Sequence, residues 1–194
     1  MIKVSNMTGK LSGIASINTN PLTNPFCVEM HKSDENIICS YCYSISMLEG
    51  FRKNCVPAFQ RNSDALIEEI SDDDIPKIKE NMARFHSHGE LLNQQHLLNF
   101  IMIAASYEEK RFVLFTKRRG MIRSLTAPVP DNLVMIFSNP RLNAEMDTVP
   151  EGFHKTFNVV NEDGYEINCG GKSCLDCQQC WSRVGNRTII ERLK

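Results

Sequence analysis

Short apolar runs that alternate with helix-length segments are the feature that most constrains how this 194-residue chain can fold. Two of the runs, residues 111–116 and 132–138, carry apolar side chains at successive positions. Strands that are apolar on both faces are typical of a parallel sheet covered by helices. We therefore predict an α/β fold with strands at residues 13–18, 82–88, 111–116, 132–138 and 155–160.

The segments between these runs predict the helices and the domain organisation. Residues 43–70 indicate one or two helices interrupted at Pro57, residues 93–107 a buried helix, and residues 120–125 a short one. The length suits a single domain over residues 1–194. We expect a partial (β/α) barrel over about residues 10–160, with a cluster loop at 27–42, followed by a Cys-rich extension over 161–194.

Polar residues follow four of the predicted strands. Because the carboxyl ends of parallel strands meet at one edge of a sheet, these residues are expected to line a common site. Lys117 could clamp an anionic group, and Ser138 could bond a ribose. The candidate ligand-binding residues are Gly89, Glu90, Thr116, Lys117, Ser138 and Asn139.

Seven of the eight cysteines fall into two groups, Cys27, Cys39 and Cys42 near the start and Cys169, Cys174, Cys177 and Cys180 near the end. Thiolates at such spacings hold zinc or iron–sulfur clusters. Crowding of four ligands into one loop favours [4Fe–4S] over the two separate knuckles of a zinc ribbon, with zinc as the alternative. The eighth, Cys55, is either a buried small residue or a fourth ligand of the first group.

Charge and apolar content bear on the partners and the cellular compartment of the protein. The formal net charge of -1 argues against a broad nucleic-acid surface. The absence of a long apolar run and of a signal-like start predicts a cytoplasmic protein without a membrane partner. In that reducing compartment, the cysteines are expected to bind metal instead of forming disulfides.

Two motifs resemble those of the radical SAM enzymes. Cys39-Ser-Tyr-Cys42 has the form C-x-aromatic-C, and His88-Gly89-Glu90 resembles the Gly-Gly-Glu-Pro motif that holds the methionine amino group of S-adenosylmethionine. The gap between Cys27 and Cys39 is eleven residues, where the usual pattern has three. The resemblance implies a three-cysteine [4Fe–4S] cluster with one iron open to S-adenosylmethionine.

A resemblance over nearly the whole chain is to the phage "gene product 88" family. It is carried by Thr8-Gly-Lys-Leu-Ser-Gly near the start, the CxxCY motif, Gly89-Glu90, Phe115-Thr-Lys117 and the terminal cysteines. This resemblance implies a phage protein with a metal-binding, barrel-like domain, and implies no particular reaction.

Together these observations predict a phage iron–sulfur protein in the cytoplasm of a bacterial host. We expect a radical SAM-like enzyme that cleaves S-adenosylmethionine at the three-cysteine cluster, with the four-cysteine cluster as an auxiliary. Its substrate would be a small molecule or a nucleotide, and no catalytic side chain is assigned. The alternative is a non-catalytic protein, stabilised by zinc or iron–sulfur, that binds a host protein or nucleic acid.

Overall fold

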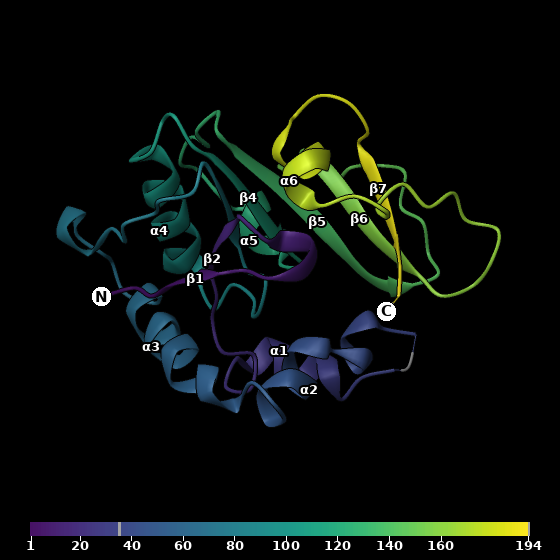
Figure 1. Cartoon of the computed structure of the whole chain (residues 1–194), viewed down its shortest axis with the longest axis horizontal. Helices are drawn as coiled ribbons and strands as arrows, with labels where there is room; N and C mark the ends of the chain where they lie inside the picture. Colours follow the sequence, from purple (N-terminus) through teal and green to yellow (C-terminus); the bar gives the residue numbers. More distant parts are fainter. Residues whose placement is uncertain (35, 194) are drawn as a thin grey trace.

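The computed structural model describes residues 1–34 and 36–193, which form one seven-stranded sheet (Figure 1). The strands lie side by side in chain order, from β1 to β7. Only β1 is antiparallel to its neighbour; every other pair is parallel. The strands are β1 (Val4–Asn6), β2 (Ala15–Ile17), β3 (Met82–Phe85), β4 (Arg111–Thr116), β5 (Leu133–Leu142), β6 (Lys155–Val160) and β7 (Thr188–Arg192).

The sheet is open, because no pairing between β1 and β7 closes it within the described residues. The alternation of strands and helices confirms the α/β class, whereas the open mixed sheet does not confirm the expected partial (β/α) barrel. The Cys-rich extension predicted for 161–194 adds β7 to the same sheet, paired with β6 along Thr156–Val160.

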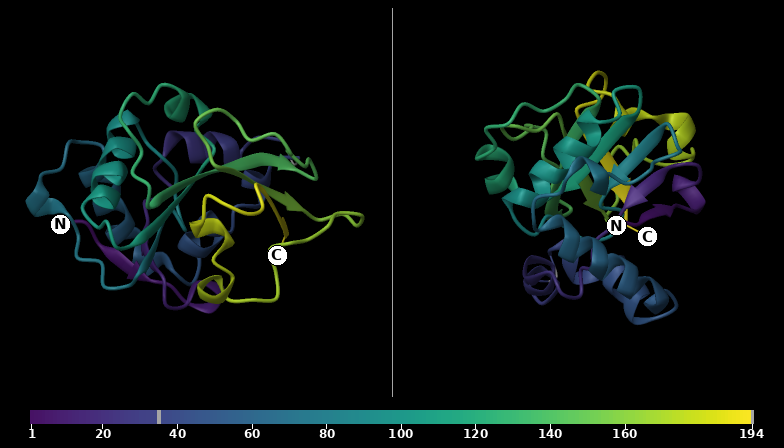
Figure 2. Two further views of the ribbon diagram at one scale, coloured as in Figure 1. Left: turned by 90° about the horizontal axis from the view of Figure 1, so that it is seen from above. Right: turned by 90° about the vertical axis from the view of Figure 1, so that its left-hand side faces the viewer.

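In the described part of the chain, six α-helices accompany the sheet: α1 (Pro25–His31), α2 (Tyr43–Glu49), α3 (Val56–Leu66), α4 (Gln94–Ala105), α5 (Arg119–Arg123) and α6 (Cys174–Cys177). Both Figures 1 and 2 show α1, α2 and α3 together on one side of the molecule, away from α6. Single 3₁₀ turns join several of these elements: η1 (Gly9–Leu11), η2 (Ile38–Tyr41), η3 (Lys53–Cys55), η4 (Asp72–Asp74) and η5 (Gln179–Trp181).

Apolar side chains of the strands enter cores on both faces of the sheet. Phe112 and Leu114 of β4 pack with α4 in the larger core, whereas Val113 and Phe115 pack with Trp181 in the smaller one. This two-sided burial explains why the predicted strand at residues 111–116 has no polar face.

Three expectations about local structure are corrected. Cys27, expected in a loop, lies in α1, which begins at Pro25 because the Asn24 side chain accepts from Phe26 N at 3.0 Å. The strand expected to reach residue 88 ends at Phe85, because His86 turns the backbone to a φ of 63°. The strand expected to stop at Asn139 continues to Leu142 through an irregular register after Ser138.

Candidate active site

A cavity of about 540 Å³ lies at the carboxyl ends of β3 and β4 and beside Ser138, within β5. Residues 86–90 after β3, Lys117 after β4 and Ser138 of β5 line it, as the arrangement of the parallel strands predicts. Its lining also includes six of the eight cysteines: Cys27, Cys39, Cys42, Cys169, Cys174 and Cys180. The two cysteine groups, remote in sequence, therefore face one cavity.

The first cysteine group comes from two consecutive elements and the junction that follows them. Cys27 lies on α1, Cys39 on η2 and Cys42 between η2 and α2. A contact of 2.8 Å between His31 Nδ1 and the Cys39 carbonyl oxygen ties α1 to η2. Burial, and secondarily the Glu90 charge, raises the pKa of the Cys27 thiol above its usual range, and burial does the same for Cys39. Cys55, at the end of η3, is not among the described residues that line the cavity.

The second cysteine group surrounds a small cavity of about 20 Å³ of its own, lined by Cys169, Cys174, Cys177 and Cys180. Gln178, in the left-handed conformation with a φ of 54°, links α6 to η5 and so turns the chain around this space. Trp181 Nε1 donates to the Ala83 carbonyl at 3.1 Å and fixes η5 to β3. Burial raises the pKa of Cys180 to about 12.

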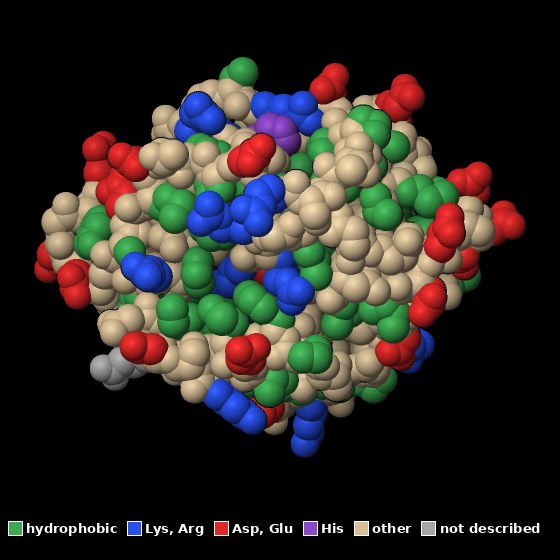
Figure 3. Space-filling model, turned by 180° about the vertical axis from the view of Figure 1, so that it is seen from behind, with side chains coloured by type: hydrophobic (Ala, Val, Ile, Leu, Met, Phe, Trp, Pro, Cys, Tyr) green, Lys and Arg blue, Asp and Glu red, His purple; other side chains and the backbone are tan. Residues whose placement is uncertain are grey.

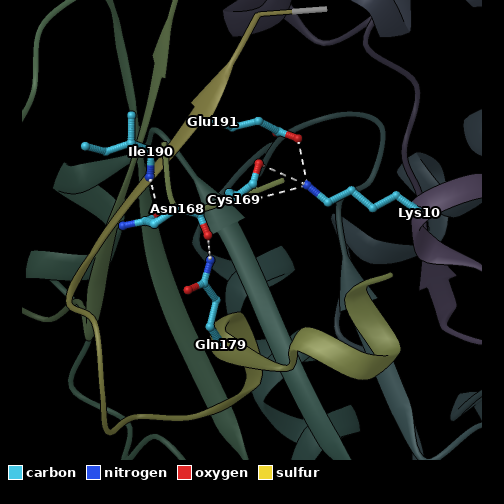
Figure 4. A network of polar contacts seen from close by, with 6 residues as sticks. All are labelled: Lys10, Asn168, Cys169, Gln179, Ile190 and Glu191. Atoms are coloured by element: carbon cyan, nitrogen blue, oxygen red, sulfur yellow. Dashed lines mark hydrogen bonds and ion pairs between the residues drawn. The ribbon is translucent and has the colours of Figure 1, made fainter. Parts of the chain in front are cut away.

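Lys10 joins this second group to the start of the chain, as Figure 4 shows. Its Nζ lies 3.0 Å from Cys169 Sγ and 2.9 Å from Glu191 Oε1. Burial lowers the pKa of Lys10, but the bonds to Cys169 and Glu191 outweigh it and raise that pKa overall. This contact could not be predicted from any one segment of sequence, because Lys10 lies 159 positions from Cys169 and 181 positions from Glu191.

All eight cysteines are free thiols. Across residues 1–34 and 36–193, no group of three or more His, Cys, Asp or Glu side chains is placed to hold a metal ion directly. The predicted metal ligands are thus gathered around shared cavities, without a finished coordination site.

Glu90 connects the ends of β3 and β4. Its carboxylate accepts from Thr116 Oγ1 at 2.6 Å, from Leu91 N at 2.8 Å and from Lys117 N at 2.8 Å. Since Thr116 and Glu90 are both buried, their polar groups are used to build the rim of the site. This arrangement also positions the backbone of Lys117, the residue directly after Thr116.

Besides Glu90, the predicted polar residues Lys117 and Ser138 line the cavity. Lys117 Nζ lies 3.1 Å from Ser138 Oγ. Burial opposes the charge of Lys117, but the nearby Cys39, Glu90, Cys27 and Cys42 raise its pKa. Asn139, in contrast, is not among the described lining residues; its amide donates to Ala144 O and Asn158 Oδ1 and shapes the end of β5.

Asn18 supports the loop after β3, and His88 of that loop lines the cavity. Asn18 Oδ1 accepts from both Ser87 N and His88 N at 3.0 Å, which holds the loop after β3. His88 packs between the rings of Tyr43 and Phe59 and lines the cavity, and burial lowers its pKa to about 4. The neutral imidazole is therefore its form near pH 7.

Comparison with known proteins assigns the family. The model of the Gene product 88 family matches residues 5–182. The chain belongs to this phage protein family. The match covers Lys10 and both cysteine groups, whereas Glu191 and Arg192 of the cavity lining lie beyond it. No curated protein and no solved structure matches the chain.

The helices also bear on the membrane expectation. No helix of this Gene product 88 protein, within the part that the structure describes, is long and apolar enough to cross a bilayer.

Proposed function

We propose that this protein is an iron–sulfur enzyme that cleaves S-adenosylmethionine reductively, with the open cluster held by Cys27, Cys39 and Cys42. The observation that carries the proposal is that these three thiols line the cavity beside Lys117 and Glu90, whereas Cys55 does not. Three thiolate ligands leave one iron of a [4Fe–4S] cluster free to bind substrate atoms. The all-thiol donor set suits iron–sulfur chemistry.

When bound, such a cluster supplies the electron that breaks the bond between sulfur and the 5′ carbon of S-adenosylmethionine. The protein's own side chains would place that molecule. The Lys117 ammonium and the Ser138 hydroxyl face the cavity and can bond its carboxylate and ribose. Glu90 keeps the Lys117 backbone in position, and Gly89, which has no side chain, lets the loop after β3 pass directly against Thr19.

The four cysteines at the end of the chain would hold an auxiliary cluster. Cys169, Cys174 and Cys180 line the same cavity as the first group, so the residues that would hold the auxiliary cluster and those that would hold the first cluster share one cavity. This position suits an electron donor or a second substrate ligand.

Anaerobic purification with analysis of iron and acid-labile sulfide tests the proposal. We expect brown protein that bleaches with dithionite, with about eight atoms of each per chain for two [4Fe–4S] clusters. The double variant Cys39→Ala/Cys42→Ala should lose about half the iron and should form no 5′-deoxyadenosine from S-adenosylmethionine and dithionite. Cys55→Ala is the matched control and should keep both.

Colourless protein with stoichiometric zinc would contradict this assignment and favour the non-catalytic alternative. Loss of the first cluster in Cys55→Ala would also contradict it, because a fourth thiolate ligand closes the iron that must stay open.

A further inference from the structure

The cavity concentrates positive charge. Five basic and two acidic side chains are among its described lining residues, although the whole chain has a formal net charge of -1. The acidic residues are Glu90 and Glu191, and the basic residues are Lys10, Arg52, Arg84, Lys117 and Arg192. Figure 3 likewise shows Lys and Arg side chains gathered around a hollow on one face of the molecule. Such a cavity favours an anionic ligand.

Most of these cations already have partners. Lys10 pairs with Glu191 at 2.9 Å, Arg192 pairs with Asp163 at 3.1 Å, and Lys117 is bonded to Ser138. Arg52 donates to Thr8 Oγ1 at 3.4 Å. These contacts leave Arg84 as the basic residue whose terminal groups need explanation.

Arg84 projects from the middle of β3 into the cavity. Its guanidinium lies over the Phe115 ring, 4.0 Å from the centroid, and its Nε donates to the His86 carbonyl at 3.3 Å. Within residues 1–34 and 36–193, neither terminal nitrogen has a hydrogen-bond or ion-pair partner. The Nε atom and the face of the guanidinium are thus held in place, and the two terminal nitrogens are available as donors to a ligand in the cavity.

Aromatic side chains complete the lining. Tyr43, Phe115, Phe157 and Trp181 all face the cavity. Flat rings of this kind stack on the base of a nucleotide. A volume of about 540 Å³ lies within the range of pockets that enclose small molecules of that size.

We propose that the cavity binds a phosphate-bearing small molecule of nucleotide size, with the phosphate on Arg84 and the base against the aromatic lining. A guanidinium with two free terminal nitrogens fits two phosphate oxygens at once, which a lysine cannot do. This ligand site goes beyond the proposed cleavage of S-adenosylmethionine and does not depend on which metal the cysteines hold. It places the substrate between the two cysteine groups.

Calorimetric titration of the anaerobically purified protein with AMP, adenosine and ribose 5-phosphate, at fixed ionic strength, tests the site. AMP should bind at least about tenfold more tightly than either fragment, because each lacks one of the two contacts. Arg84→Met should weaken AMP binding about 10- to 100-fold and leave adenosine binding unchanged. The AMP affinity of Arg84→Lys should fall between those of wild type and Arg84→Met. Arg123 is an exposed residue of α5, so Arg123→Met is the control and should bind AMP as wild type does.

Equal affinities for AMP and adenosine would overturn the phosphate site, as would wild-type AMP affinity in Arg84→Met. Equal affinities for AMP and ribose 5-phosphate, or no saturation by AMP below about 10 mM, would overturn the nucleotide assignment. If Arg84→Met does not fold, as judged by circular dichroism, Arg84→Lys decides the question, because it keeps the charge and loses the fork. The iron content of each sample separates this result from the test of the clusters.

Discussion

Gly89 lies where the loop after β3 passes closest to the segment after β2. Its φ is 94°, and a methyl group at this position would overlap both the side chain and the carbonyl of Thr19. Thr19 is itself buried and its backbone N–H donates to the His88 carbonyl at 3.1 Å. The close approach therefore depends on the missing side chain, and it fixes the neighbouring Glu90 at the rim of the cavity.

Gly89→Ala should lower the free energy of unfolding by about 2–4 kcal/mol, since it combines a strained φ with a backbone clash. Gly120→Ala is the control: Gly120 has an ordinary φ, lies in α5 and has open space around it. That change should be neutral or stabilising by less than about 1 kcal/mol. Urea denaturation of the two variants checks the difference, and an equal effect would show that the contact with Thr19 does not constrain the loop.

At the scale of single residues, the sequence predicted which positions surround the site better than what they do there. Glu90 and Thr116 followed predicted strands and do lie at the rim, but they bond to each other. Asn139 bonds within its own strand end. Such pairings depend on the distance between strand tips, which no single segment of sequence contains.

Among the elements, α4 makes an unusual contact with the end of β3. His96 of α4 is fully buried, and its ring meets that of His86 edge-on at a centroid distance of 5.0 Å. His96 Nδ1 accepts from Leu92 N at 3.3 Å, whereas its Nε2 has no hydrogen-bond partner among the described residues. Burial lowers the pKa of His96 from 6.5 to about 3, and that of His86 well below its usual value.

Stability should therefore fall as the pH drops below about 6.5. The unfolded chain takes up protons on both rings in that range, but in the folded chain His96 resists protonation until about pH 3, so acid favours the unfolded state. His96→Phe should flatten the dependence of the unfolding free energy between pH 6 and pH 4 by about 1.4 kcal/mol per pH unit. Urea denaturation across this range checks it; an unchanged slope would mean that His96 does not contribute.

Elements whose apolar pattern stands alone were predicted closely. The strands at 111–116 and 155–160 match β4 and β6. The short helix α1 was missed because its seven residues carry little periodicity, and only Asn24-Pro25 marks its start. The extension of β5 past Pro140 was missed because a proline usually ends a strand unless an irregularity accommodates it.

In the whole molecule, Lys10, near the start of the chain, contacts the second cysteine group, near its end. Lys10 contacts both Cys169 and Glu191 there. The Lys10 side chain is 26% exposed and the Glu191 side chain 20% exposed, so the ion pair is partly buried. The sequence predicted both cysteine groups but not their common cavity, because the order of strands and the return of the last strand decide which loops face each other. The role of Arg84 was not predicted for the same reason: it is one polar residue within an apolar strand, and only the strand order shows that it faces the cavity.

Lys10→Met should free the last segment of the chain. We expect a loss of about 1–2 kcal/mol of stability, since a partly buried charged hydrogen bond is removed. Hydrogen exchange should become faster at residues 168–180 and in β7, with β3 and β4 unchanged. Lys3→Met, at an exposed side chain, is the control. Uniformly faster exchange across the whole sheet would contradict a local role for Lys10.

The outer edge of β7 is covered by the same segment that carries the last four cysteines. Asn168 N and Cys169 N both donate to the Ile190 carbonyl, and Asn168 Oδ1 accepts from Ile190 N. An uncovered strand edge is a template for pairing with another copy of the chain. Oxidation of these thiols, or any other displacement of Cys169, would therefore expose the unpaired backbone groups of β7. Loss of the cysteine site would then be accompanied by self-association through this strand edge.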